Sequence, residues 1–197
     1  SPYVTIYNTS DWSKVTNPSV LPTGYCNSAA FSQSGALLAI AHAVSPYVTI
    51  YNTSDWSKVT NPSVLPTGYC NSAAFSQSGA LLAIAHAVSP YVTIYNTSDW
   101  SKVTNPAVLP TGLGSGAEFN NSGTLLCISH TSSPYLTIYN TSDWSKVANP
   151  AVLPTGNGSS ISFNSTDQLL TVTHTATPYL TTYNTSDWSK VTDPSVL

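Results

Sequence analysis

The chain repeats one 44-residue sequence. Residues 1–44 and 45–88 are identical, and diverged copies begin at Ser89 and Ser133. A fifth copy starts at Thr177 and ends at Leu197, so four times 44 plus 21 gives the 197 residues. Because each motif was copied with the repeat, five occurrences of one feature count as about one independent observation. The period therefore constrains the fold more than any single residue does.

Each repeat is expected to form four short β-strands and no helix. β-branched, aromatic or alternating residues mark two of the strands, small residues mark the third, and an apolar run too short for a typical helix marks the fourth. In the first copy these strands are 3–7, 12–16, 27–31 and 37–41. Turn residues at 8–11 and 33–35 and a loop with two prolines and a glycine at 17–24 separate them.

Four strands in about 44 residues is the size of one blade of a β-propeller. β-Solenoid coils and leucine-rich repeats are usually shorter, and the other common repeats are helical. The small-residue strand fits the crowded position next to the axis, so we name the strands A (about 27–32), B (37–42), C (47–51) and D (56–60). The sequence thus predicts an all-β propeller of 44-residue four-stranded blades.

The predicted propeller is a single array over residues 1–197, with four full blades and an N-terminal half blade. The half blade, 1–24, consists of a C strand and a D strand. The four full blades are expected at about 25–64, 69–108, 113–152 and 157–197. Because the last blade has its own C and D strands, the half blade is spare. An unpaired, largely apolar pair of strands favours association.

Charged residues make up 7% of the chain, there is no Arg, and the net charge is −3. This composition lacks the basic patch with which proteins bind nucleic acid or anionic membranes. No apolar run approaches the ~18 residues of a membrane span, so membrane insertion is not expected. A surface of Ser, Thr, Asn and Tyr favours a virion or extracellular location over a cytoplasmic one.

Two stretches of the repeat resemble WD40-like and YVTN-like propeller blades. The run from Phe31 to Ala39, FSQSGALLA, is similar to their F-S-P-D-G-x-x-L-A stretch, and 47–52 lies where they place an aromatic-rich third strand. Ala41-His42, 45–51 and 61–68 also resemble highly repetitive propellers of phages and bacteria. The resemblance covers the whole chain and implies the fold, but it says little about function.

The chain departs from these families at three points. Gln33-Ser34 replaces the Pro-Asp of the turn, and the Asp-His-Ser-Trp hydrogen-bond tetrad of WD40 blades does not map onto the repeat. Lactonase-type propellers need a Glu, Arg and His set, whereas this chain has a single Glu, Glu118, and no Arg.

Four histidines share one repeat position at the end of strand B. They are His42, His86, His130 and His174. A propeller would arrange them in a ring away from its axis, too far apart to share one metal ion. We therefore expect each to bond a neighbouring loop, with a ligand-binding ring as the alternative. Neither a metal site nor a cofactor is predicted.

No catalytic residue is predicted. There is no G-x-S-x-G motif, no acidic residue recurs near the histidines, and the carboxylates are not paired. The three cysteines show no metal-binding spacing. The sequence thus favours a protein that is not an enzyme.

The turn between strands C and D combines an aromatic residue with a glycosylation sequon. The tryptophans, a candidate rim binding site, are Trp12, Trp56, Trp100, Trp144 and Trp188. The sequon asparagines are Asn8, Asn52, Asn96, Asn140 and Asn184. The rings suit either sugar stacking or packing between blades, and the asparagines suit either N-glycans or ordinary turns.

The function that these features favour is a non-enzymatic structural or binding propeller of a phage, a virion or a cell surface. Its expected partner is itself, because a homo-oligomer could form through the half blade or the rim. A multivalent lectin that binds glycans is the alternative. A lactonase-like enzyme is the least favoured, because ionisable residues are so sparse.

Overall fold

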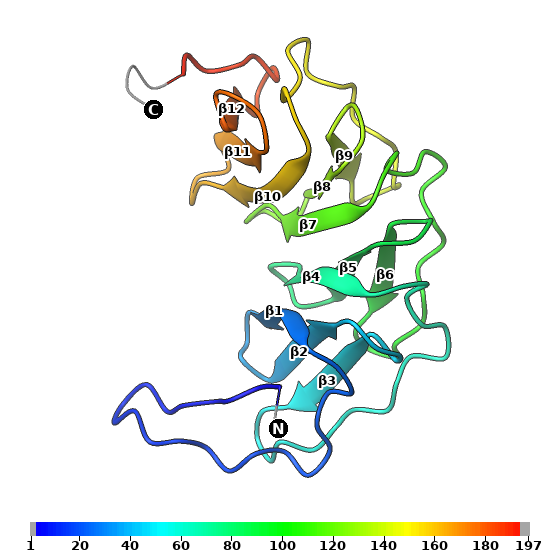
Figure 1. Cartoon of the computed structure of the whole chain (residues 1–197), viewed down its shortest axis with the longest axis vertical. Coiled ribbons are helices and arrows are strands. Elements are labelled where there is room, and N and C mark those ends of the chain that lie inside the picture. Colours follow the sequence, from blue (N-terminus) through cyan, green and yellow to red (C-terminus); the bar gives the residue numbers. More distant parts are fainter. Residues whose placement is uncertain (1–2, 194–197) are drawn as a thin grey trace.

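The computed structural model describes residues 3–193, and its strands form four antiparallel three-stranded sheets, one in each repeat (Figure 1). The sheets are β1 Cys26–Phe31, β2 Leu37–His42 and β3 Val48–Asn52; β4 Cys70–Phe75, β5 Leu81–His86 and β6 Val92–Asn96; β7 Gly114–Phe119, β8 Leu125–His130 and β9 Leu136–Asn140; β10 Gly158–Phe163, β11 Leu169–His174 and β12 Leu180–Asn184. The predicted all-β fold and strands A, B and C are confirmed, within one or two residues at each end.

The predicted fourth strand, D, is reduced to one β-bridge in each repeat. In the first blade Tyr51 pairs with Lys58, and the Val59 N–H donates to the Ile50 carbonyl at 2.8 Å. The segment does not extend further because Trp56 has a left-handed φ of 58° and Pro62 follows closely. The expectation of four regular strands was wrong in this respect, and the blade is a three-stranded sheet with a short outer extension.

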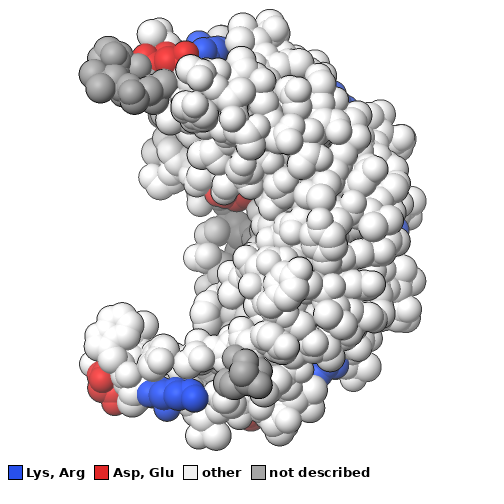
Figure 2. All heavy atoms as spheres, viewed as in Figure 1, with Lys and Arg blue, Asp and Glu red and all other residues white. Residues whose placement is uncertain are grey.

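The four blades form an open arc (Figure 1). The first strands, β1, β4, β7 and β10, line its concave side, and the first strands of neighbouring blades contact one another. This inner position agrees with the small side chains of β1 and β4. The two ends of the chain lie at opposite ends of the arc, and Figure 2 shows the hollow between them with few charged atoms on its surface.

The hydrophobic cores lie between blades rather than within them. At the first complete junction, Val48 and Ile50 on β3 share one buried cluster with Leu82 and Ile84 on β5. The next two junctions repeat this arrangement 44 and 88 residues later. Burying a Leu or Ile side chain contributes about 1.5–3 kcal/mol, so each blade depends on its neighbour for stability.

Amide side chains bridge the first two junctions. The Asn27 Nδ2 group donates to the Cys70 carbonyl at 2.8 Å, and the Asn71 Nδ2 group donates to the Gly114 carbonyl at 2.8 Å. Each bond joins the first strand of one blade to the first strand of the next, on the concave side. These bonds fix the register of neighbouring blades.

Carboxylates bridge the third junction instead. The Phe163 N–H donates to Glu118 Oε1 at 3.1 Å, and burial raises the pKa of Glu118. Asp167 accepts bonds of 2.7 Å from the N–H groups of Asn121 and Ser122. Burial acts to raise the pKa of Asp167, but these hydrogen bonds lower it below its ordinary value. The last two blades are thus joined by charge-assisted hydrogen bonds.

Candidate functional site: the N-terminal edge of the arc

The N-terminal segment packs on the first blade as a C strand would. Val4 and Ile6 contact the buried cluster of Leu38 and Ile40. Val48 and Ile50, which lie 44 residues later, pack in the same way against the next blade. The expected half blade is therefore positioned as the outer half of a preceding blade, although Ser1 and Pro2 lie outside the described residues.

No strand A or B of that preceding blade lies among the described residues. At the first complete junction, Ala39 and Ala41 on β2 close the core, and their equivalents would lie before residue 1. An apolar groove of about 210 Å³ occupies this place. Its main lining residues are Val4, Ile6, Ala29, Phe31, Leu38 and Ile40.

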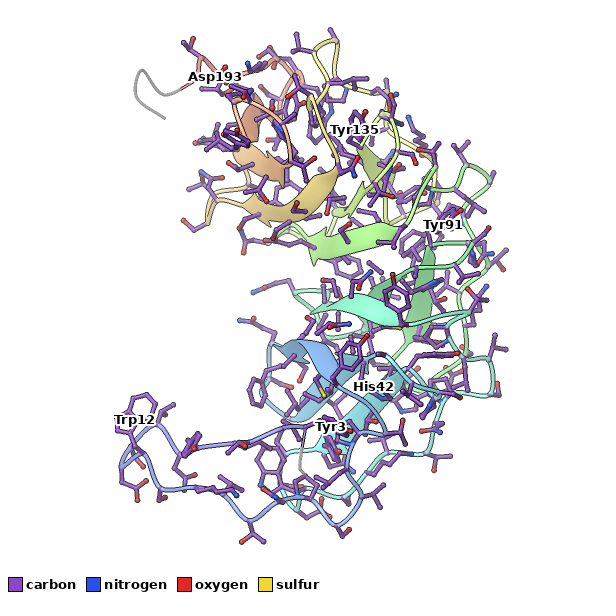
Figure 3. The ribbon with its side chains drawn as sticks, in the orientation of Figure 1. Tyr3, Trp12, His42, Tyr91, Tyr135 and Asp193 are labelled. Carbon is purple, nitrogen blue, oxygen red and sulfur yellow. The ribbon has the colours of Figure 1, made fainter. Side chains whose placement is uncertain are left out.

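Large aromatic side chains are exposed around the groove. Phe31 is 56% exposed, whereas Phe119, at the same repeat position, is 7% exposed. Tyr7 is 53% exposed, whereas its equivalent Tyr51 is fully buried. Trp12 is 74% exposed and lies at the tip of the N-terminal loop (Figure 3). Such a concentration of exposed aromatic surface at one edge is typical of an interaction site.

The edge of the N-terminal strand also lacks a strand partner. Strand β3 pairs with β2 through five residue pairs, including Tyr51 with Leu38. Within the described residues, the segment 3–7 forms only the bridge from Tyr7 to Lys14, on its other side. The predicted strand 3–7 is consequently not regular, because the strand B that would hold it is absent. An open edge of this kind is a template for another strand.

The C-terminal end of the arc has a different surface. Its last sheet is fully paired, and threonines replace the apolar residues that face the next blade elsewhere. Thr171 and Thr182 share a hydroxyl bond of 3.0 Å, and the Ser160 N–H donates to Thr173 Oγ1 at 3.1 Å. Terminal repeats with a polar outer face keep such arrays soluble. Among the described residues, this outer face is thus more polar than the N-terminal edge, although Tyr179 is 59% exposed.

A second hollow, of about 350 Å³, lies beside the last blade. Its lining residues are Gln168, Leu169, Asn184, Thr185 and Ser186. They offer amide and hydroxyl groups but no titratable side chain. This hollow therefore supplies no general acid or base.

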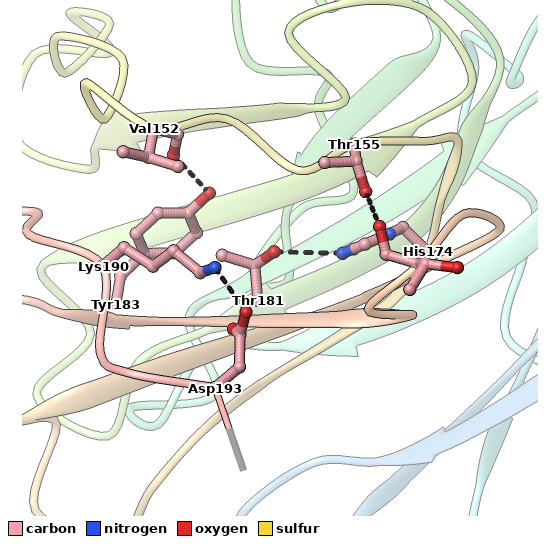
Figure 4. Close-up of polar contacts among 8 residues, drawn as sticks. Val152, Thr155, His174, Thr181, Tyr183, Lys190 and Asp193 are labelled. Carbon is pink, nitrogen blue, oxygen red and sulfur yellow. Dashed lines mark hydrogen bonds and ion pairs between the residues drawn. The ribbon is translucent and has the colours of Figure 1, made fainter. Parts of the chain in front are cut away.

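The four histidines lie at equivalent places, and each bonds a threonine of its own blade. The Nε2 atom lies 3.0 Å from Thr Oγ1 in three of the pairs and 2.9 Å in the fourth, with His174 and Thr181 drawn in Figure 4. All four rings are buried. Burial lowers the pKa of His86 and of His130 to about 4, and nearby backbone carbonyls oppose this only in part. The partner that all four histidines share is thus a strand residue, and His86 also has the expected contact with the neighbouring loop, where Thr67 Oγ1 lies 3.4 Å from its Nδ1 atom.

No candidate metal centre was found among residues 3–193, which contain no group of three or more His, Cys, Asp or Glu able to hold an ion. Each histidine is held within its own blade, so the structure does not bring the four together. Cys70 and Cys127 are buried in the cores between blades, and burial raises their pKa.

The tryptophan rim is mostly part of the packing. Trp56 and Trp100 are partly buried and contact the cores between blades, and Trp144 and Trp188 do the same. Among the five, only Trp12 is largely exposed. All five have a φ near 58°, a left-handed conformation that the sequence did not indicate.

The sequon asparagines hold the turn between strands C and D. The side-chain amide of each donates to the hydroxyl of a serine five residues later, at 2.8 to 3.0 Å. An aspartate in the same turn accepts a bond from that serine's N–H at 2.9 Å, and this bond lowers the aspartate pKa. The turn thus uses its asparagine for local structure.

Sequence reasoning missed the tyrosine that ties each blade to the loop before it. Tyr51 Oη donates to the Val20 carbonyl at 2.8 Å, and Tyr183 does the same to Val152 (Figure 4). For Tyr7 the equivalent carbonyl would lie 31 residues earlier, before residue 1. The signal in the sequence was an invariant tyrosine at the end of each C strand.

Comparisons with known proteins identify the fold. No family model and no curated protein matches the chain. Among solved structures it is similar to Kuenenia stuttgartiensis hydrazine synthase, with a TM-score of 0.71 and 13% identity, over 94% of this chain and 51% of the other. The TM-score is 0.70 for both U3-55K, at 10% identity, and the RRP9 WD40 repeats, at 11% identity.

The two latter alignments cover 86% of this chain and 52% and 51% of the other chains. The chain thus spans about half the length of the solved structures that it matches. In the described part of the chain no helix is long and apolar enough to cross a membrane. At these identities the likeness concerns the fold alone, and the fold is that of a WD40-like β-propeller.

Proposed function

We propose that the protein is a non-enzymatic structural or binding propeller that assembles through its N-terminal half blade. The observation that carries this proposal is the groove beside Val4 and Ile6, which no strand A or B of the described residues covers. Filling it would remove Phe31 from water, as Phe119 is removed at a complete junction. Burying such a ring contributes about 1.5–3 kcal/mol.

The low charge supports a structural role over an enzymatic one. Only 7% of the residues are charged, and both hollows lack paired titratable groups. A virion or cell-surface setting agrees with the hydroxyl-rich surface and with the sequence resemblance to repetitive phage and bacterial propellers. In this setting two or more chains would share a ring or stack through the half blade.

The test is the mass of the full chain in solution over a range of concentrations, by light scattering. We expect the mass to rise above the 20.8 kDa of one chain as concentration increases. The variant Phe31→Asp should reduce this rise, because it places a charge in the groove. The control Val108→Asp, at a site that is 51% exposed on another surface, should not. A strict monomer at every concentration would overturn the proposal.

A further inference from the structure

The two ends of the chain carry nearly the same segment. Residues 1–21 and 177–197 differ at four of 21 positions, which are Ser1/Thr177, Val4/Leu180, Ile6/Thr182 and Asn17/Asp193. The C-terminal segment forms strand β12 and pairs with β11. The N-terminal segment has the sequence for the same pairing but no strand B beside it. The chain therefore has two candidate C strands for one β11 edge.

The register of an exchanged pair follows from the last blade. Thr182 lies opposite Thr171, and Tyr183 lies opposite Leu170. In an exchanged pair, the repeat positions would place Ile6 of one copy opposite Thr171 of the other copy. Tyr7 would then lie opposite Leu170. Tyr7 would then be buried as Tyr183 is, with the carbonyl of Val152 within reach of its hydroxyl group.

We propose that strands β10 and β11 of a second copy fill the N-terminal groove, with residues 3–17 replacing residues 179–193 of that copy. The inference rests on the proposed function, because it names the partner of the same groove. The side chains of Thr171 and Thr173 hold the repeat positions of Ala39 and Ala41, which close the core at a complete junction. Their methyl groups would lie against Ala29 and Phe31.

Two chains joined in this way at both ends would form a ring of eight blades. Each chain would supply three blades of its own strands, and two further blades would be shared, which gives two times three plus two. Eight blades lie within the range of about four to eight found in propellers.

Two contacts favour the C-terminal segment over its competitor. Thr182 shares the hydroxyl bond with Thr171, and Asp193 forms an ion pair of 2.7 Å with Lys190 (Figure 4). The N-terminal segment has Ile6 and Asn17 at these positions, so it lacks the hydroxyl bond and could form only the neutral lysine–asparagine hydrogen bond that Lys58 makes with Asn61. Residues 177–197 therefore restrain exchange by holding β11 within their own chain.

A disulfide trap in the full chain identifies the pairing. Two single variants, Ile6→Cys and Thr171→Cys, are prepared in a Cys26→Ser background and mixed under mild oxidation. These positions lie at opposite ends of one arc, whereas exchange places them side by side in different chains. We expect the mixture to give a covalent dimer in which position 6 of one chain is linked to position 171 of the other. Either variant alone should give little dimer. As a control, Thr171→Cys with Thr182→Cys in one chain should crosslink within that chain.

Variants of the C-terminal segment test the restraint. Asp193→Asn removes the ion pair and should strengthen association by about two- to fivefold. Tyr183→Ala should strengthen it by about tenfold or more, because it removes a buried ring from β12. Adding Tyr7→Ala to Tyr183→Ala should return the chain to a monomer. Circular dichroism checks the folding of each variant. If Tyr183→Ala unfolds, the association of Asp193→Asn still tests the restraint.

The outcomes separate this inference from the proposed function. Association that depends on Phe31 but gives no disulfide between 6 and 171 would overturn the exchange and leave the proposed function standing. A strict monomer for the wild type, Asp193→Asn and Tyr183→Ala would overturn both. A disulfide between positions 6 and 171, together with association that becomes stronger in the order wild type, Asp193→Asn, Tyr183→Ala, would support both.

Discussion

Each histidine of the repeat is buried, and its Nε2 atom bonds one threonine of the same blade. For His86 the partner is Thr93, at 2.9 Å. We expect His86→Asn or His86→Gln to lower the free energy of unfolding by about 1–3 kcal/mol, because the buried Thr93 hydroxyl loses its partner. Urea denaturation measures this change. Chelators should leave the stability unchanged, and a clear loss with EDTA would point instead to a bound metal.

The buried histidines also set a pH dependence. The pKa of His86 and of His130 is lowered by burial to about 4 in the folded chain, below the ordinary 6.5 that the unfolded chain keeps. Between these values the unfolded state binds more protons, so stability falls as pH is lowered from 6.5 towards 4. The slope should be about 1.4 kcal/mol per pH unit for each histidine. Replacing both by Gln should flatten the profile, and an unchanged slope would contradict the assignment.

At the residue scale, the sequence predicted that the four histidines are equivalent but not which threonine they share as a partner. The period placed the four histidines at one position of the blade and excluded a shared ion, as repeat geometry requires. It could not show that Nε2 meets Thr93 seven residues later, because that contact depends on the register of β5 with β6. It also missed the role of Asp167. The carboxylate of this residue accepts hydrogen bonds from the N–H groups of Asn121 and Ser122, in the turn of the preceding blade.

At the element scale, the tryptophans in the turn before strand D differ in burial. Trp56 and Trp100 take part in cores between blades, whereas Trp12 is 74% exposed. We expect the double variant Trp56→Ala with Trp100→Ala to lose about 2–5 kcal/mol in the free energy of unfolding. Trp12→Ala is the matched control and should change stability by less than about 0.5 kcal/mol. If the folded double variant kept its stability, the rings would have no packing role.

The sequence predicted strands A, B and C because their composition and turns are consistent with one another. It overstated strand D, because alternation at 56–60 gave no sign of the left-handed Trp56. It also overstated the strand at 3–7, where β propensity is high but the neighbouring strand is absent. Propensity describes what a segment can form, and pairing determines what it does form.

At the scale of the whole molecule, the period predicted the propeller and the spare half blade. It did not predict that the two ends differ in polarity, because this depends on which face of each sheet remains uncovered. We expect the backbone amides of Val4 to Tyr7 to exchange with deuterium far faster than those of Val48 to Tyr51, since only the latter segment pairs with a strand B. Hydrogen exchange followed by NMR tests this, because assigned resonances separate the two segments of identical sequence, and equal rates would show that the N-terminal edge is already covered.

The identity of the first two copies has a practical consequence. Residues 1–44 and 45–88 have the same letters, yet Phe31 is 56% exposed and Phe75 packs partly against a buried core. Any spectroscopic or chemical difference between the two copies must therefore come from their neighbours, because amino-acid sequence is held constant. Comparing equivalent residues of the two copies therefore separates the effect of the amino-acid sequence from the effect of the packing around it.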